Sequence, residues 1–336
     1  MSERELLPID YGFNRVTGQP FRQVNLLGGS VKTKKGEKWR VDTKVLYMLP
    51  AQKCRELVQK PTGMLILKRI VALSMEVPWL PTTSEESLLE KAFVWNACTH
   101  ADKCKEDCLA TTSGHLSLDD NQMFMLAKTL LFLAFPHAFE DQLHLEIERH
   151  GDDVYRRNQR AKQRGCRLPK WEAAVRLNGG ADIEWSKDLY TRHRDVIYYD
   201  YTKVESRMTA YLGGSTYPEN YYLTFSWGSS NDRAVARVLL GGGNVAVVVR
   251  DPGLRGLYKT DGVRVGDRTV RVPEGTEDTP HYGDVSDIRY RDPQGSLIFL
   301  SPKGPVAKKD RTTGFVKRDV VEISGRLASS LDRREG

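Results

Sequence analysis

Three of the five cysteines in this chain lie close together, with the spacing Cys98-x5-Cys104-x3-Cys108. Thiolates are soft ligands that bind zinc and iron–sulfur clusters. Three thiolates leave one coordination position open, and an open position is where chemistry takes place at a metal. Charged residues surround the second and third cysteines, so this segment does not fit an apolar core. We therefore predict a metal or cluster site, with structural or redox thiols as the alternative.

The spacing leaves the identity of the metal open. It matches no zinc finger built from two closely spaced cysteine pairs. A zinc site would need a fourth ligand, and His100 and His115 flank the cysteines. A 4Fe-4S cluster on the same three thiolates is the other candidate.

The segments around the cysteines are expected to hold them in place. A short helix over 84–91 and a buried strand over 92–95 lead into the cysteine segment. An apolar helix over 116–135, which Pro136 ends, follows it. A further helix is expected over 140–164.

From residue 171 the chain alternates between strand and helix patterns. Strands are expected over 173–178, 196–202, 221–227 and 245–249, with helices over 183–192, 204–212 and 232–240 between them. This alternation predicts βα units and a parallel sheet. With the strand over 92–95 as the first, we expect an α/β fold with a parallel βα barrel or partial barrel. An open doubly wound sheet is the alternative.

The later part of the chain predicts a small antiparallel β appendage, with strands near 269–272, 287–291 and 296–300. The predicted regions are an irregular N-terminal region over 1–85, a barrel-like domain over 86–252, the appendage over 253–325 and a frayed tail over 326–336. The chain has no run of about 18 apolar residues and no apolar signal-peptide core. We therefore expect a cytoplasmic protein without a membrane partner.

The carboxyl ends of the predicted strands are the place to look for a site, because active sites of parallel α/β folds lie there. Four polar residues at these ends break the apolar pattern of a parallel sheet: Arg176, Asn178, Asp200 and Lys203. We assign Asp182, Asp200 and Lys203 to catalysis. We assign Arg176, Asn178, Gly179, Gly180 and Tyr201 to binding of substrate or cofactor. The alternatives are that Asp182 caps a helix and that Arg176 pairs with Asp200 in a structural ion pair.

The formal net charge of +7 permits a nucleic-acid partner. The basic residues Lys34 and Lys35 lie in a loop, and Arg156, Arg157 and Arg160 lie on the helix over 140–164. We predict that these five residues contact phosphates, with a solvated surface as the alternative.

Three motifs together resemble the uncharacterised phage proteins of the gene-product-88 type. They are the cysteine cluster ending Cys108-Leu-Ala, the strand end Arg176-Leu-Asn178 with Asp182 beyond it, and the strand end Tyr201-Thr-Lys203. The resemblance covers about residues 90–210. It implies a phage origin, and thus the host cytoplasm, but no established reaction.

The order of a cysteine cluster followed by a barrel also resembles radical S-adenosylmethionine enzymes. In those enzymes three cysteines hold a four-iron cluster whose open iron binds the cofactor. Their usual spacing is Cys-x3-Cys-x2-Cys, from which Cys98, Cys104 and Cys108 depart at both gaps.

These observations give three hypotheses. The first is an iron–sulfur enzyme, with S-adenosylmethionine as a candidate cofactor, that acts on a nucleotide or nucleic-acid base, as in DNA modification. The second is a zinc-dependent, transglycosylase-like base-exchange enzyme, a transferase, in which Asp182 or Asp200 acts as nucleophile or base. The third is a non-enzymatic nucleic-acid-binding protein stapled by a metal.

Overall fold

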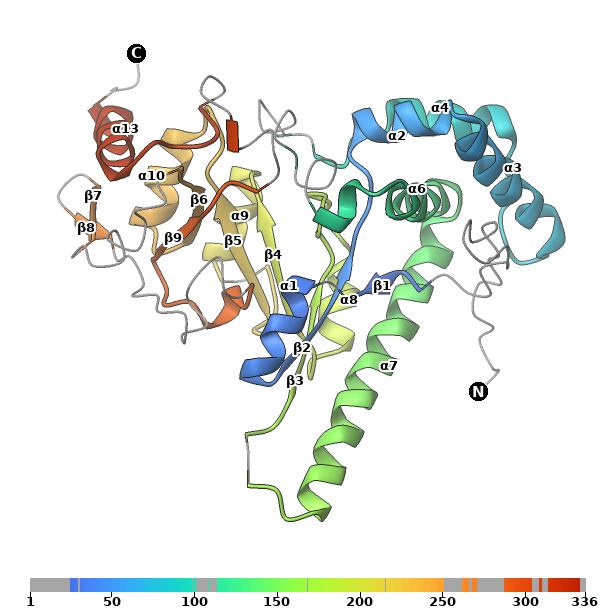
Figure 1. The fold of residues 1–336 in the computed structure, drawn as a ribbon, viewed down its shortest axis with the longest axis horizontal. Helices are drawn as coiled ribbons and strands as arrows, with labels where there is room; N and C mark the ends of the chain where they lie inside the picture. Colours follow the sequence, from blue (N-terminus) through green and yellow to red (C-terminus); the bar gives the residue numbers. More distant parts are fainter. Residues whose placement is uncertain are drawn as a thin grey trace.

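The core of the protein is one seven-stranded sheet, whose strands lie beside one another across the centre of Figure 1. The computed structural model describes residues 25–29, 31–98, 100, 108, 114–167, 169–214, 216–250, 262–265, 268–270, 287–303, 308–309 and 314–332. The strand order is β1-β2-β3-β4-β5-β6-β9. All neighbouring strands are parallel except β1, which is antiparallel to β2. The strands are β1 (Leu27–Gly28), β2 (Val41–Leu46), β3 (Glu172–Arg176), β4 (Ile197–Thr202), β5 (Tyr221–Ser226), β6 (Asn244–Val248) and β9 (Leu297–Leu300).

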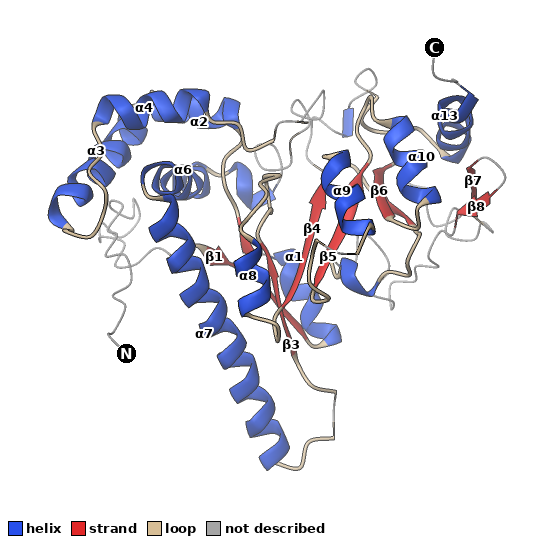
Figure 2. Ribbon diagram, turned by 180° about the vertical axis from the view of Figure 1, so that it is seen from behind, coloured by secondary structure: helices blue, strands red, loops and turns tan. Residues whose placement is uncertain are grey.

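Helices α7 (Pro136–Gln163), α8 (Lys187–Arg192), α9 (Glu205–Leu212) and α10 (Asp232–Leu240) connect successive parallel strands. Figure 2 shows them on the same side of the sheet. This follows from the right-handed crossover of consecutive βαβ units along a sheet that is laid down in sequence order. We call this side the helix face.

A helical layer lies beside one end of the sheet (Figure 1). It consists of α2 (Ala51–Val58), α3 (Pro61–Glu76), α4 (Glu85–Val94) and α6 (Asp119–Ala134). The chain passes through this layer between β2 and β3, and α7 then leads back to the sheet. The remaining described elements are α1 (Val31–Lys34), η1 (Lys35–Trp39), η3 (Gly114–Ser117), β7 (Val263–Val265), β8 (Arg268–Val270), η4 (Arg289–Arg291) and α13 (Val320–Asp332).

Successive residues of each strand point to opposite faces of the sheet. On β4, Tyr198 belongs to the main core beneath the helices, whereas Tyr199 belongs to a smaller cluster on the opposite face. That smaller cluster includes Val41, Ala174 and Ile288. The segment containing η1 and the segment containing η4 cover this opposite face, because Trp39 and Tyr290 pack against the cluster.

The predicted alternation of strands and helices after residue 171 is confirmed, but the predicted first strand over 92–95 is wrong. These residues lie at the end of helix α4, whose N-cap Ser84 accepts a hydrogen bond from the Ser87 backbone N–H. The buried residues Leu88 and Ala92 are four positions apart, as one face of a helix requires. The apolar run was misleading because Val94 is exposed rather than buried.

The sheet does not close into a barrel among the described residues, since β1 and β9 form two separate edges. The structure supports a mixed α/β fold with a mainly parallel sheet and a separate two-stranded antiparallel sheet of β7 and β8. Strand β9, expected in the appendage, instead pairs in parallel with β6. The strand expected over 287–291 is wrong, because residues 289–291 form the 3-10 helix η4.

The two ends of the chain also differ from the expectation. The region over 1–85 supplies β1 and β2 to the main sheet and two helices to the helical layer. Residues expected to fray from Arg326 onward include the last turns of α13. None of the described helices is long and apolar enough to cross a membrane. The predicted limits between regions stay predictions.

Candidate functional site

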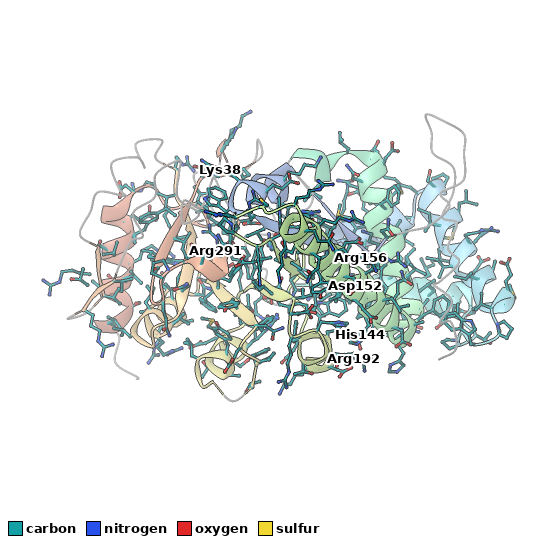
Figure 3. All side chains as sticks on the ribbon, turned by 90° about the horizontal axis from the view of Figure 1, so that it is seen from below. Lys38, His144, Asp152, Arg156, Arg192 and Arg291 are labelled. Carbon is teal, nitrogen blue, oxygen red and sulfur yellow. The ribbon has the colours of Figure 1, made fainter. Side chains whose placement is uncertain are left out.

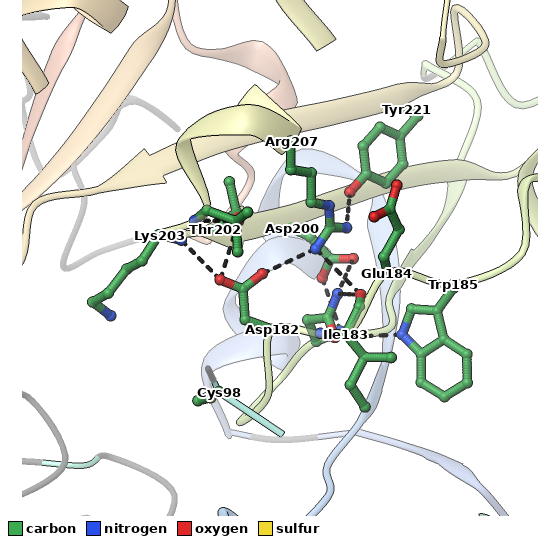
Figure 4. A network of polar contacts seen from close by, with 12 residues as sticks. Cys98, Asp182, Ile183, Glu184, Trp185, Asp200, Thr202, Lys203, Arg207 and Tyr221 are labelled. Carbon is green, nitrogen blue, oxygen red and sulfur yellow. Dashed lines mark hydrogen bonds and ion pairs between the residues drawn. The ribbon is translucent and has the colours of Figure 1, made fainter. Parts of the chain in front are cut away.

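The loop after β3, whose residues Asp182, Ile183 and Trp185 are labelled in Figure 4, is organised by the side chain of Asn178. Its amide oxygen accepts hydrogen bonds from the Ile183 backbone N–H at 2.9 Å and from the indole N–H of Trp185 at 3.3 Å. Its amide nitrogen donates to the Ile183 carbonyl at 3.0 Å. One buried amide therefore closes the loop over residues 178–185 and fixes the position of Asp182 within it.

Asp200 supports this loop from the neighbouring strand. Its carboxylate accepts hydrogen bonds from the Asn178 backbone N–H at 2.9 Å and from the Asn178 side chain at 3.3 Å. Asp200 is only 1% exposed. Burial raises its pKa to about 6, against the lowering effect of the cations Arg207 and Arg176. Asp200 therefore acts on Asn178 and is not placed to touch a substrate.

Asp182 lies at the carboxyl edge of the sheet and is held by three groups. It accepts hydrogen bonds from the Thr202 hydroxyl at 3.0 Å, from the Lys203 backbone N–H at 2.8 Å and from the Arg207 guanidinium at 3.0 Å. The side chain of Asp182 is 11% exposed. Asp182 is not a helix cap, since Ser186 caps α8. That alternative is wrong.

Arg207 is the centre of this network, and the sequence analysis missed it. Its guanidinium donates to Asp182, to the Ile183 carbonyl at 3.2 Å and to the Tyr221 hydroxyl at 2.5 Å. Its side chain is 3% exposed. A signal existed: Arg207 lies four residues before Tyr211, on the side of α9 that also carries Met208. A charged residue on the apolar side of a short helix needs a buried partner.

The cysteine segment meets the same loop. The Asp182 backbone N–H donates to the carbonyl of Ala97 at 2.7 Å. The next residue, Cys98, has its thiol 4.0 Å from the Gly180 carbonyl oxygen, within reach of a weak sulfur hydrogen bond. Figure 4 shows Cys98 below Asp182. Cys98 and the loop after β3 therefore lie next to each other in the structure.

The three-cysteine metal site stays a prediction. Cys98 and Cys108 are half-buried, whereas Cys104 lies outside the described residues. Among the described residues, no group of three or more His, Cys, Asp or Glu side chains is arranged to hold a metal ion. His100 is described and exposed, and the side chain of His115 is not described.

Gly179 has a packing role in this loop. A Cβ atom there would lie 2.5 Å from Val45 and 2.7 Å from the Tyr47 ring. The Gly179 backbone N–H also donates to the Leu46 carbonyl at 3.0 Å. The absent side chain thus lets the loop pass close against β2. The neighbouring Gly180, half-buried, offers its carbonyl toward Cys98.

Arg176 and Tyr201 belong to a separate network on the opposite face of the sheet. Arg176 forms a buried ion pair with Asp287, and its guanidinium lies 5.1 Å from the centre of the Tyr201 ring. The Tyr201 hydroxyl donates to Asp287 at 3.3 Å. The predicted alternative, an ion pair between Arg176 and Asp200, is wrong, because strand alternation directs these two side chains to opposite faces. Nothing in the pattern around Asp287 marked it as the partner.

Lys203 contributes its backbone to one network and its side chain to another part of the molecule. Its N–H binds Asp182, while its ammonium group lies 5.8 Å from the centre of the Phe315 ring. The polar rim expected from the sequence is therefore divided between two faces.

The predicted phosphate contacts lie away from this edge. Lys34 ends α1 and is exposed, and Lys35 begins η1, so both lie in helical turns rather than in the expected loop. Arg156 pairs with Asp152 at 3.3 Å on the surface of α7 (Figure 3). Arg157 pairs with Asp42 at 2.9 Å. Arg160 is exposed farther along α7.

With this geometry established, comparison with known proteins gives one result. The chain matches the gene product 88 family over residues 64–319, well over half of its length. This protein therefore belongs to the gene product 88 family, a family of phage proteins, as the three motifs suggested. No curated protein and no solved structure matches the chain. The resemblance to radical S-adenosylmethionine enzymes has no support from these comparisons.

Proposed function

We propose that this protein is an enzyme that acts on a nucleotide or a nucleic-acid base at the carboxyl edge of its sheet. One observation carries this proposal: the hydrogen bond between the Asp182 N–H and the Ala97 carbonyl. It joins the cysteine segment to the loop that presents Asp182. A thiol and a fixed carboxylate thereby share one edge, where parallel α/β enzymes carry their active sites.

Base exchange is the reaction that this edge supports best. Of the two carboxylates in this network, Asp182 is the more accessible, with a side chain that is 11% exposed, and Arg207, Thr202 and the Lys203 N–H fix its orientation. In base exchange, a carboxylate oxygen bonds to the sugar carbon while the bond from that carbon to the base breaks. The departing base keeps the electron pair and takes up a proton. A second base then displaces the carboxylate, restores a glycosidic bond and releases its ring-nitrogen proton, which balances the proton taken up by the departing base.

Asp200 and Asn178 act as positioning residues in this proposal. Asp200 is buried, so it cannot reach a sugar or a base directly. It holds Asn178, and Asn178 closes the loop that carries Asp182. A held nucleophile needs no reorganisation when the substrate binds, which lowers the barrier.

The metal of this proposal would be bound by Cys98, Cys104 and Cys108. The two described thiols fit this role, because half-buried thiols can ionise and still be reached by a metal. Zinc bound there would supply a Lewis acid or a structural anchor, whereas a 4Fe-4S cluster would supply redox chemistry. Radical chemistry with S-adenosylmethionine is the second candidate, and the three-thiolate pattern supports it. The metal content separates the two.

The metal is tested on protein purified without oxygen. Iron, sulfide and zinc are quantified and a visible spectrum is recorded for the wild type, for Cys98→Ser and for the matched control Cys166→Ser. We expect zinc at about one per chain that Cys98→Ser removes and Cys166→Ser keeps. Iron together with sulfide and absorbance near roughly 400 nm would instead favour radical chemistry with S-adenosylmethionine.

The reaction is tested by incubating the protein with DNA and isotopically labelled free bases, and measuring label in the polymer. We expect Asp182→Asn to lower incorporation by about 100-fold or more with the metal retained, because the nucleophile is lost. Asp188→Asn, which changes an exposed carboxylate on α8, is the control. Incorporation by Asp182→Asn at the wild-type rate would overturn the assignment of Asp182.

A further inference from the structure

The C-terminal half of α7 and its return to β3 form a projection with one sign of charge. Figure 1 shows α7 extending below the sheet before the chain turns back. Between Tyr155 and Trp171 there is no acidic residue, and there are seven basic residues: Arg156, Arg157, Arg160, Lys162, Arg164, Arg167 and Lys170. We call residues 155–171 the basic hairpin.

The base of this hairpin is anchored to the body of the protein. Arg157 pairs with Asp42, and its guanidinium lies 4.6 Å from the centre of the Trp171 ring. Asn158 exchanges two hydrogen bonds with the backbone of Trp171, at 2.8 and 2.9 Å. The two arms of the hairpin are therefore tied together, and its position relative to the sheet is fixed.

The cations toward the tip are different. All five are exposed: Arg160, Lys162, Arg164, Arg167 and Lys170. Within the described part of the chain, none of their side chains makes a hydrogen bond or an ion pair. Arg160 and Arg164 lie four residues apart, one turn after Arg156, which pairs with Asp152, and the three residues span about 12 Å. Unpaired like charges repel one another, and a polyanion would remove that repulsion.

From this arrangement we infer that the basic hairpin binds the phosphate backbone of double-stranded DNA. The side chains between the cations include the amides Gln159 and Gln163, which suit hydrogen bonds to phosphate and sugar. An apolar side for insertion into a bilayer is absent here, since Tyr155 is the only exposed large hydrophobic residue of the described hairpin. A helix about 10–12 Å wide also fits the major groove, which is about 12 Å wide.

The same helix connects the hairpin to the candidate site. Near its other end, Phe139 stacks on Trp185 with 6.2 Å between ring centres, and Trp185 donates to Asn178. The 28 residues of α7 span about 42 Å, the length of about 12 base pairs. This inference deepens the proposed function by making the substrate a base within a duplex, and it rests on that function for the chemistry.

Binding is measured by fluorescence anisotropy with a 20-base-pair DNA duplex over a range of salt concentrations. For the variant Arg160→Gln/Arg164→Gln, we expect about tenfold weaker binding or more, and a slope of log affinity against log salt that is smaller by about 2. The control Lys68→Gln/Arg69→Gln removes two exposed cations from α3 and is expected to bind as the wild type does.

A footprint tests the location directly. Cys166 is exposed within the hairpin. We expect the duplex to slow alkylation of Cys166 at low salt and not at high salt, as followed by mass spectrometry of its peptide. Buried Cys54 is the internal reference.

Binding of DNA by the basic hairpin and base exchange at Asp182 are tested by different measurements, so either proposal can fail without the other. Asp182→Asn is expected to bind the duplex as the wild type does, even if it loses base incorporation. Equal weakening by the hairpin variant and the α3 control would overturn the hairpin assignment. Binding to anionic vesicles with no binding to the duplex would overturn it in favour of a membrane surface.

Discussion

Asp200 and Tyr201 are neighbours on β4, but their side chains belong to two buried polar networks on opposite faces of the sheet. On the helix face, Asp200, Asn178, Asp182 and Arg207 hold the loop that meets the cysteine segment. On the opposite face, Tyr201 and Arg176 hold Asp287, the residue that leads into η4. Each network contains a buried arginine and at least one buried carboxylate, so the two are chemically similar.

The two networks differ in the part of the molecule that each one holds in place. The network on the helix face orients a carboxylate that remains partly exposed at the carboxyl edge. Exposure alone separates the two carboxylates little, since the side chain of Asp182 is 11% exposed and that of Asp287 is 6% exposed. What differs is the surroundings, because Asp182 lies in the loop that contacts the cysteine segment. We therefore assign function to the first network and attachment of the segment 287–292 to the second. Buried charges by themselves do not distinguish a site from a structural contact.

The largest effect is expected for Arg207→Met. This variant leaves Asp182 and Asp200 near one another without their main cation, and an uncompensated buried charge costs about 3–5 kcal/mol. The free energy of unfolding is measured by urea denaturation. Arg237→Met, which removes an exposed pair with Glu205, is expected to cost less than about 1 kcal/mol. A loss equally small for Arg207→Met would mean that the network on the helix face is not a stabilising centre.

A smaller and more local effect is expected for Arg176→Met. Asp287 is left buried without its cation, and we expect the segment 287–292 to loosen and let it regain water. We expect a loss of about 2–3 kcal/mol in the free energy of unfolding. Proteolysis should increase near residues 287–292. The double variant Arg176→Met/Asp287→Asn should recover part of the loss. If the double variant loses the sum of both single effects, the two residues are not coupled.

The smallest effect is expected in the pH dependence of stability. Burial raises the pKa of Asp200 in the folded state to about 6, above its value in the unfolded chain. Asp200 therefore destabilises the fold as pH rises from about 4 to 6, by an amount on the order of 2 kcal/mol. Asp200→Asn should remove this contribution.

The measurement is the difference in free energy of unfolding between the wild type and Asp200→Asn from pH 4 to pH 7. The difference is needed because His144 and His193, whose pKa values are lowered by burial, act in the opposite direction. Their contribution to the free energy of unfolding decreases as pH falls below about 6.5, because the folded state disfavours their protonated form. A difference that does not change with pH would mean that Asp200 is ionised throughout this range.

Local sequence patterns were sufficient to predict many of the elements. The strands and helices after residue 171 were predicted because short apolar runs alternate there with segments of helical periodicity. Each βα unit carries its own local pattern, so it can be recognised independently of the rest of the chain. The strand over 92–95 was wrong because four apolar residues fit either a strand or the end of a helix. In this case the helix that began at Ser84 continued through them.

The candidate site was predictable in its residue types and only partly in its arrangement. Asn178 and Asp200 were identified because polar residues at strand ends are unusual in a parallel sheet. Arg207 was missed because it lies within a helix, and Asp287 because it lies 111 residues from Arg176 in the chain. Partners that distant are brought together by the fold and leave no local pattern.

By itself, the sequence determined the βα order, the three cysteines in one segment, the family and the stretch of basic residues without acidic partners. The tertiary structure alone decided that the polar rim is divided between two faces, that Arg207 holds Asp182, and that the basic stretch projects from the body. The physical reason is that a strand alternates its side chains between two faces, and the packed layers on each face then select the partner of every buried charge.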